Sequence, residues 1–127
     1  YNVSVLSMGN PHCVLRVDSI ASADVDRLGP AIEEHPQFPE ATNVGFMSVE
    51  DRSNIELRVW ERGVGETLAC GTGACAAVVA GQRLDLLDED VSVRLPGGQL
   101  VVSWRGGAAP VWLTGNAELI SEGTIDL

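Results

Sequence analysis

Apolar and polar residues alternate along several short stretches of the chain, which is the pattern of half-buried β-strands. Residues 1–17 predict two short strands separated by the Gly-Asn-Pro turn of SMGNPH. Further strands are expected at 44–49 and at 55–60, where Ile, Leu and Val alternate with Glu and Arg. From residue 91 onward the pattern resembles hairpins, with strands in VSVRL, QLVVSW, VWLTG and AELISEGTIDL separated by PGG and RGGAAP turns.

Two stretches have helical spacing instead. Residues 23–35 show helix-like apolar spacing that a Gly-Pro pair interrupts, so one short or broken helix is expected. Residues 72–87 are small and apolar nearly all round, which predicts a second helix buried on every side. The segment ERGVGETLACG before it is expected to be a long turn. The predicted fold class is therefore α+β, with an antiparallel, barrel-like sheet wrapped around a central apolar helix.

Length and composition narrow the class of protein. The 127 residues suit one domain, and a net charge of −10 argues against nucleic acid, whose phosphates need a basic face. All basic residues are arginine, so the chain has no lysine amine for Schiff-base chemistry with pyridoxal phosphate or a carbonyl substrate. Three cysteines fit a reducing compartment better than a disulfide framework. With no long apolar run and no basic leader visible, a soluble, cytoplasmic protein without a membrane partner is expected.

The segment ETLACGTGACAA at 66–77 has three competing interpretations. Its glycines match the G-x-G-x-x-A pattern of dinucleotide loops, but polar residues separate them from the preceding strand, and the acidic run at 88–90 precedes the next strand. A metal or redox pair of Cys70 with Cys75 is disfavoured, because five helical positions set the side chains about 140° apart. Cys13 forms no recognised metal set with the two histidines. Cys13 and Cys75 are therefore expected in the core, and no metal site is expected.

The third interpretation is a reactive thiol at a helix N-terminus. Cys70 directly precedes the predicted helix, where unpaired N–H groups and the positive end of the dipole are expected to lower its pKa. Gly71 and Gly73 would let a ligand carboxylate approach the same N–H groups. A structural cysteine buried in a tight turn is the alternative.

Four other polar residues are candidates to meet this thiol. His12 follows Asn-Pro at a strand junction, where it either relays a proton or lies at the edge of the core. Glu61 and Arg62 end an alternating strand. They form either a surface ion pair or a site in which Arg62 binds a carboxylate and Glu61 takes a proton or binds an ammonium. Asn43 either orients a ligand or caps a turn.

Four motifs in register resemble one family. GNPHCV at 9–14, TNVGF at 42–46, WERGVGET at 60–67 and ACGTGACA at 69–76 have the order and approximate spacing of the C-terminal half of diaminopimelate epimerases. The resemblance covers essentially the whole chain. The ACGTG motif alone is less specific, since it is also similar to proline racemases of the same fold.

The resemblance implies two pseudo-symmetric halves, each a barrel-like sheet around a central helix, with the active site in the cleft between them. Enzymes of this family interconvert LL- and meso-diaminopimelate without a cofactor, on the route to lysine and peptidoglycan. Two cysteines, one from each half, remove and deliver the α-proton on opposite faces of the substrate.

The same resemblance assigns candidate roles by motif. Cys70 resembles the C-terminal catalytic cysteine. Gly71 and Thr72 resemble the residues whose backbone N–H groups bind the reacting carboxylate. The other matches fall on substrate-binding positions, Asn10, Asn43, Glu61 and Arg62, and on polar partners of the thiols, His12 and Glu61.

The family's N-terminal half, with its second cysteine, has no match in the chain, and Cys13 and Cys75 do not replace it. The chain starts without Met on a strand-like alternation, so we expect a piece of a longer protein that is inactive alone. The segment from about 116 to 127 packs on the N-terminal half in the family. Here it is expected to be disordered or to pair with another copy in a homodimer. A proline- or hydroxyproline-type racemase and a non-catalytic binding or scaffold domain remain alternatives.

Overall fold

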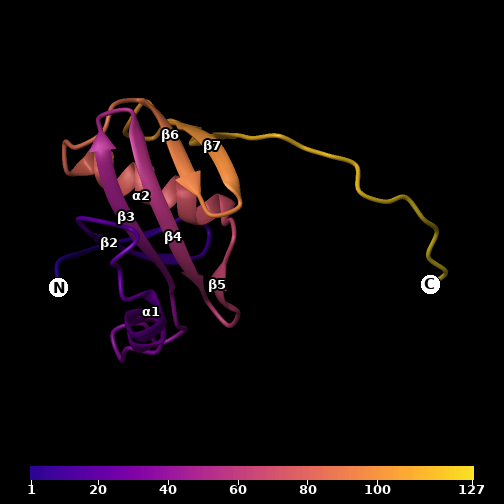
Figure 1. Ribbon diagram of the computed structural model, residues 1–127, viewed down its shortest axis with the longest axis horizontal. Helices are drawn as coiled ribbons and strands as arrows, with labels where there is room; N and C mark the ends of the chain where they lie inside the picture. Colours follow the sequence, from indigo (N-terminus) through magenta and orange to yellow (C-terminus); the bar gives the residue numbers. More distant parts are fainter.

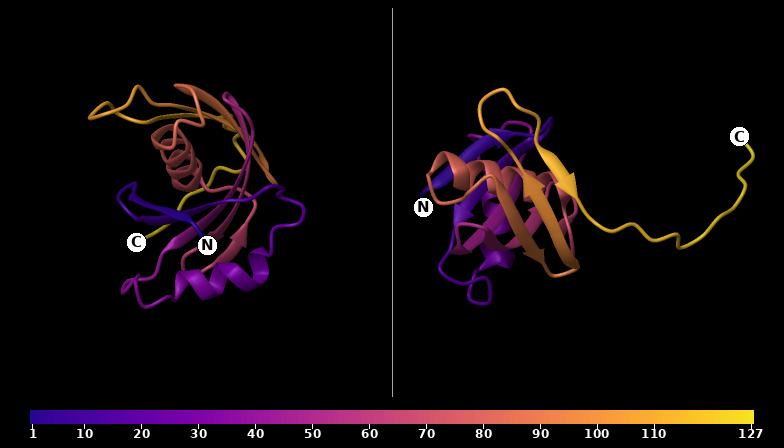
Figure 2. Two further views of the ribbon diagram at one scale, coloured as in Figure 1. Left: turned by 90° about the vertical axis from the view of Figure 1, so that its left-hand side faces the viewer. Right: turned by 90° about the horizontal axis from the view of Figure 1, so that it is seen from above.

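A curled β-sheet wraps around one central helix in the computed structural model, which describes residues 1–127. The central helix is α2, Gly71–Arg83, and it lies inside the curl (Figures 1 and 2). A shorter helix, α1, Val25–Glu33, packs on the outside of the same sheet (Figure 2). The predicted α+β class, with a barrel-like sheet around an apolar helix, is confirmed.

The sheet has eight strands in the order β1-β2-β3-β4-β6-β7-β8, with β5 paired to β4. Most neighbours are antiparallel, but β2 runs parallel to β3 and β4 runs parallel to β6. The sheet that was predicted as antiparallel is therefore mixed, with two parallel pairs. Parallel neighbours need a crossover connection, and each helix supplies one: α1 lies between β2 and β3, and α2 between β4 and β6. The strands are β1 Val3–Ser7, β2 Pro11–Arg16, β3 Asn43–Asp51, β4 Asn54–Glu61, β5 Gly65–Thr67, β6 Asp90–Leu95, β7 Gly98–Ser103 and β8 Trp112–Thr114.

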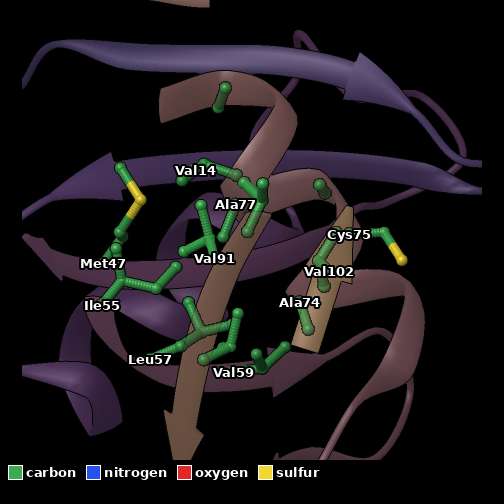
Figure 3. Packing of buried hydrophobic residues seen from close by; sticks show 14 of the residues in the cluster. Val14, Met47, Ile55, Leu57, Val59, Ala74, Cys75, Ala77, Val91 and Val102 are labelled. Atoms are coloured by element: carbon green, nitrogen blue, oxygen red, sulfur yellow. The ribbon is translucent and has the colours of Figure 1, made fainter. Parts of the chain in front are cut away.

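Two hydrophobic clusters lie on the two faces of the sheet. The inner cluster packs α2 against the alternating apolar side chains of β4, and Figure 3 shows this packing around Ala77. Nine successive residues of α2 are buried, which explains why they are small: the surrounding sheet leaves little room for side chains. The outer cluster joins Val25 of α1 to β2 and β3. Cys75 and Cys13 are buried in the inner and outer clusters respectively, as expected from the sequence.

Both helices differ in extent from the sequence-based expectation. α1 is one short helix that runs through Pro30 without a break. Its contacts with the sheet and with the Trp60 side chain outweigh the hydrogen bond that proline removes. α2 stops before residue 87, because Asp85 has a left-handed conformation (φ 56°). The N–H groups of Asp85 and Leu86 bond back to the carbonyls of Gln82 and Gly81, which is a Schellman ending.

Two strand predictions also need correction. The segment expected to be only a long turn contains β5, which pairs with the end of β4. The last predicted strand, in AELISEGTIDL, is absent: residues 115–127 form neither helix nor strand and run away from the sheet (Figure 1). Their alternating pattern finds no neighbouring strand edge to supply hydrogen bonds. Their large apolar side chains are exposed, namely Leu119, Ile120, Ile125 and Leu127.

Neither helix has the length and apolar character needed to cross a membrane. No group of three or more His, Cys, Asp or Glu side chains is placed to hold a metal ion.

The backbone of Gly29 in α1 packs closely against the Trp60 side chain. A Cβ atom there would come within 2.6 Å of the Trp60 ring carbons Cγ and Cδ2, so the ring or the helix must shift. We expect Gly29→Ala to lower the free energy of unfolding by about 1–3 kcal/mol, although alanine is the better helix former. Urea denaturation measures this. Ala31→Ser at an exposed position of α1 is the control, with a change below about 0.5 kcal/mol; an equally stable Gly29→Ala protein would contradict the packing described.

Cys13 makes the fold sensitive to alkali. Burial raises the pKa of Cys13 from 9.0 to about 11. The folded chain thus keeps a proton that the unfolded chain releases, so stability is present below pH 9 and falls as the pH rises toward 11. The loss attributable to Cys13 approaches about 2–3 kcal/mol. Urea midpoints measured from pH 7 to pH 11 test this, and Cys13→Ala is expected to show a shallower decline; parallel declines in the two proteins would refute it.

Candidate active site

The predicted site residues come together at one end of α2. Asn10 and His12 lie at the start of β2, and Asn43 begins the parallel strand β3 directly opposite His12. Glu61 ends β4, which runs antiparallel to β3 and so finishes at the same edge. Cys70 is the N-cap of α2 at that edge. Four motifs that are far apart in the sequence therefore meet because two strands begin and one ends at the same place.

Cys70 caps the helix through its own sulfur atom. The residue is extended, and the Gly73 N–H donates to Sγ at 3.3 Å. The Thr72 hydroxyl lies 3.8 Å from Sγ. A Cβ at position 73 would lie 3.1 Å from both Sγ and the Val59 side chain, which is tighter than ordinary contacts, so glycine favours this close approach. Cys70 is 8% exposed and belongs to the inner cluster.

The pKa of the Cys70 thiol is raised, which is opposite to the expectation from the helix N-terminus. Burial is the largest cause, and the charge of Glu61 and its hydrogen bond with the thiol act in the same direction. The Gly73 N–H and the Thr72 hydroxyl lower the pKa, but they do not outweigh burial. The prediction of a lowered pKa is therefore wrong for this chain. At neutral pH Cys70 carries its proton and is equipped to donate it.

The first turn of α2 offers two free backbone donors beside the thiol. The N–H groups of Gly73 and Ala74 are occupied by Cys70, through Sγ and the carbonyl oxygen respectively. The N–H groups of Gly71 and Thr72 have no intrahelical acceptor. Together with the positive end of the helix dipole, they form a place where a carboxylate can bind next to Sγ.

A hydrogen-bonded chain connects His12 to the region of Cys70. His12 is buried, and its Nε2 atom lies 3.1 Å from Asn10 Oδ1. The Asn10 amide in turn donates to the Thr72 hydroxyl at 3.3 Å. Burial lowers the pKa of His12, with Glu61 opposing this and Arg62 adding to it. The imidazole is thus neutral at pH 7, and it orients Asn10 without a direct hydrogen bond to Cys70.

Asn43 connects the strands that carry the site. Its amide donates to the Pro11 carbonyl at 3.0 Å, and its Oδ1 atom accepts from the Arg62 N–H at 2.9 Å. The Arg62 guanidinium is exposed and donates to the Glu40 carbonyl at 3.0 Å, which leaves its other donors without a protein partner. No ion pair joins Glu61 to Arg62, so the surface-pair alternative is not what the structure contains.

Two residues that the sequence did not single out hold Glu61 and Arg62 in place. Thr67 of β5 donates to Glu61 Oε1 at 2.6 Å. Glu33 of α1 accepts hydrogen bonds from the Trp60 indole at 2.7 Å and from the Gly63 N–H at 2.6 Å. It thus bonds to the residue before Glu61 and to the residue after Arg62. Glu33 had no signal in the sequence beyond an ordinary exposed helix face. Thr67 lay within the WERGVGET motif, but only the β4–β5 hairpin reveals its contact.

The site is open to solvent on one side. Cys70, His12 and Asn43 are buried, whereas Arg62 and Thr72 are exposed. Exposed apolar side chains, Val64 and Leu68, lie in the same β4–α2 connection. A hollow of about 710 Å³ lies elsewhere, between β1, β2 and the end of α2, and contains none of the predicted site residues.

Comparison with known proteins identifies relatives of the chain. The family model described as diaminopimelate epimerase matches residues 4–120. A curated diaminopimelate epimerase from Thioalkalivibrio sulfidiphilus is 60% identical over all of this chain and 46% of its own length. One from Alkalilimnicola ehrlichii is 59% identical over 98% of this chain and 45% of its own length. The chain thus spans slightly less than half the length of these relatives.

Solved structures support the fold independently. A phenazine biosynthesis protein of the PhzF family from Enterococcus faecalis superposes with a TM-score of 0.60 at 18% identity, over 81% of this chain and 38% of that one. A Bacillus anthracis protein of the same family gives 0.59 at 16% identity, over 87% and 37%. At these identities the likeness concerns the fold alone. By the match over residues 4–120, the chain belongs to the diaminopimelate epimerase family.

Proposed function

We propose that these 127 residues form one half of the active site of a cofactor-independent diaminopimelate epimerase, with Cys70 as one of its two acid/base thiols. The observation that carries the proposal is the position of Cys70: its sulfur caps α2 beside the free N–H groups of Gly71 and Thr72. The product would serve lysine and peptidoglycan synthesis, as in the family that the motifs resemble.

In the proposed mechanism the helix terminus holds the reacting carboxylate. The Gly71 and Thr72 N–H groups bind the carboxylate of the stereocentre, which sets the α-carbon next to the Cys70 sulfur. When the α-proton leaves, its electron pair remains on the α-carbon and spreads into the carboxylate. The added negative charge is then stabilised by the two N–H groups and the helix dipole.

Cys70 serves one face of the α-carbon. In one direction its S–H donates a proton to the α-carbon, a C–H bond forms, and a thiolate remains. In the reverse direction the thiolate removes that proton. Glu61 favours the protonated thiol and His12 stays neutral, so the resting state is the proton donor. This fits an acid whose partner base acts from the opposite face.

The remaining site residues are proposed to bind and orient the substrate. Arg62 presents free guanidinium donors to a carboxylate, for which a planar fork is suited. Asn43 connects β3 to β2 through the Pro11 carbonyl, and Asn10 connects the start of β2 to Thr72 of α2, so both amides lie at the same edge. Glu61 is placed to accept a hydrogen bond from the substrate ammonium as well as from the thiol.

Inversion needs an acid and a base on opposite faces, and this chain offers one suitable thiol. Cys13 lies in the outer cluster and Cys75 within α2, so neither can face Cys70 across a substrate. We therefore place the second thiol in the part of the relatives that this chain does not span. The exposed apolar side chains of residues 116–127 would pack on that part.

A chimera tests the proposed function. The 127 residues replace the matching part of the Thioalkalivibrio sulfidiphilus relative, and interconversion of LL- and meso-diaminopimelate is followed by NMR in deuterium oxide. We expect activity within about tenfold of the unmodified relative, because the two sequences are 60% identical here.

Two results would count against the proposal. A folded chimera that binds diaminopimelate without exchanging its α-proton would indicate a binding or scaffold domain. A chimera that racemises proline or hydroxyproline but leaves diaminopimelate unchanged would indicate the related racemase.

A further inference from the structure

Thr67 lies in β5, the short strand that returns the chain from Glu61 toward Cys70. β5 pairs with β4 so that Gly65 lies opposite Glu61 and Thr67 opposite Val59. The Thr67 hydroxyl is 2.6 Å from Glu61 Oε1 and 3.5 Å from the Ala69 carbonyl. A hydroxyl has one proton to donate, and the shorter distance to a charged acceptor assigns it to Glu61.

The residues on both sides of Thr67 are anchored to other elements. Glu66 forms two hydrogen bonds with Arg58 of β4, at 2.6 and 2.8 Å, and Arg58 also donates to the Ile20 carbonyl. The Leu68 carbonyl accepts from the Gly97 N–H at 2.7 Å. These hydrogen bonds fix the backbone on both sides of Thr67, so the Thr67 hydroxyl is held next to Glu61.

The Glu61 carboxylate in turn lies close enough to two groups of the candidate site to change their pKa. Its charge raises the pKa of His12 against the effect of burial, and it raises the pKa of Cys70 through charge and a hydrogen bond. Glu61 ends β4, so its side chain has rotational freedom unless something holds it. Apart from the Cys70 thiol, the Thr67 hydroxyl is the one protein group that donates to it in the structure.

We propose that Thr67 is a positioning residue that fixes the Glu61 carboxylate at the end of β4, on the side of Cys70. This inference rests on the proposed role of Cys70, but the contact itself exists in the 127-residue chain whatever reaction the chain supports. Without the hydroxyl, the carboxylate turns toward solvent and its influence on the thiol weakens. Because Glu61 favours the protonated thiol, losing that influence makes the thiolate easier to form.

The test measures the reactivity of Cys70 in the 127-residue chain. Iodoacetamide alkylation is followed between pH 7 and pH 11 by mass spectrometry of the peptide that contains Cys70. We expect Thr67→Val to raise the alkylation rate at pH 8 about threefold, since the thiolate is the reacting species. Thr67→Ser keeps the hydroxyl and is expected to behave like the parent chain.

A double-mutant cycle separates positioning from a merely structural effect. In a Glu61→Gln background the Thr67→Val change should have no further effect on alkylation, because the charged group that it positions is gone. Urea midpoints for each variant exclude unfolding as the cause, and Thr67→Ala serves as a second variant if valine destabilises the loop. An unchanged pH profile in folded Thr67→Val, or an equal effect in both backgrounds, would overturn the inference.

An activity measurement distinguishes this inference from the proposed function. In the chimera, Thr67→Val should lower kcat with little change in KM, and Thr67→Ser should restore it. An inactive chimera with the expected alkylation cycle would refute the proposed function and support the positioning role. An active chimera whose Thr67→Val variant keeps both the parent kcat and the parent alkylation profile would refute the positioning role alone.

Discussion

Replacing Cys70 by alanine in the Thioalkalivibrio chimera is expected to lower kcat for LL–meso interconversion by about 10³-fold or more. The change removes the proton donor from one face of the α-carbon, and a positioned acid or base contributes about 10²–10⁴ in rate. The reacting carboxylate keeps its N–H donors in Gly71 and Thr72, so KM should change little. Initial rates measured by NMR from both LL- and meso-diaminopimelate give the two parameters in each direction.

Cys75→Ala provides the matched control for this prediction. Cys75 is a cysteine of the same helix, but it packs in the inner cluster instead of capping the helix end. Its replacement should leave kcat within about threefold while costing stability through lost packing. Equal losses of kcat in the two variants would mean that Cys70 acts through the fold and not as an acid.

Arg62→Gln is expected to raise KM for diaminopimelate about 10- to 100-fold and to change kcat by less than about threefold. Removing a charge-assisted hydrogen bond to a carboxylate costs about 1.5–3 kcal/mol, and this contact would exist equally in the ground and transition states. The Arg62 backbone N–H that bonds to Asn43 is retained, so the local structure should persist.

Arg105→Gln is the control for the loss of a positive charge. Arg105 is highly exposed and pairs only with Glu89, away from the site. The Arg105→Gln substitution should leave the KM for diaminopimelate unchanged at constant ionic strength. If both substitutions raised KM equally, general electrostatic attraction of the substrate would explain the effect, and the direct role of Arg62 would be wrong.

Strands with regular alternation were predictable from the sequence. In β4, Ile55, Leu57 and Val59 point into the inner cluster because every second side chain faces the same side. β5 could not be found this way, since its three residues are Gly-Glu-Thr and its contacts, the pairing with β4 and the Arg58–Glu66 ion pair, are with another strand. The alternating pattern in residues 115–127 predicted a strand that the structure does not contain. A strand needs a neighbouring strand for its hydrogen bonds, and this segment has none.

The relative direction of neighbouring strands also could not be predicted from the pattern of apolar and polar residues. Alternation indicates which residues face inward, but not whether neighbouring strands are parallel. The parallel pairs arise because α1 and α2 each carry the chain back across the sheet before the next strand begins. The α1 crossover brings the start of β2 and the start of β3 to one edge, and the antiparallel pairing of β3 with β4 makes β4 end there.

The proximity of the motif residues was easier to predict than the electrostatics around Cys70. The motif residues Cys70, Asn10 and His12 do lie near one another, but the sign of the pKa change at Cys70 depends on how deeply the thiol is buried. Burial is a tertiary property with no local signal. Thr67 and Glu33 were missed for the same reason, since their contacts with Glu61 and Trp60 cross between elements.

The proposal that the chain forms only one half of an active site is tested most directly with the purified 127-residue chain alone. It is incubated with LL-diaminopimelate in deuterium oxide, and the meso product is measured by NMR against a protein-free control. We expect no meso product above that control, because inversion needs a second acid/base group on the opposite face of the α-carbon. Formation of meso-diaminopimelate at a rate near that of the intact Thioalkalivibrio relative would contradict the account.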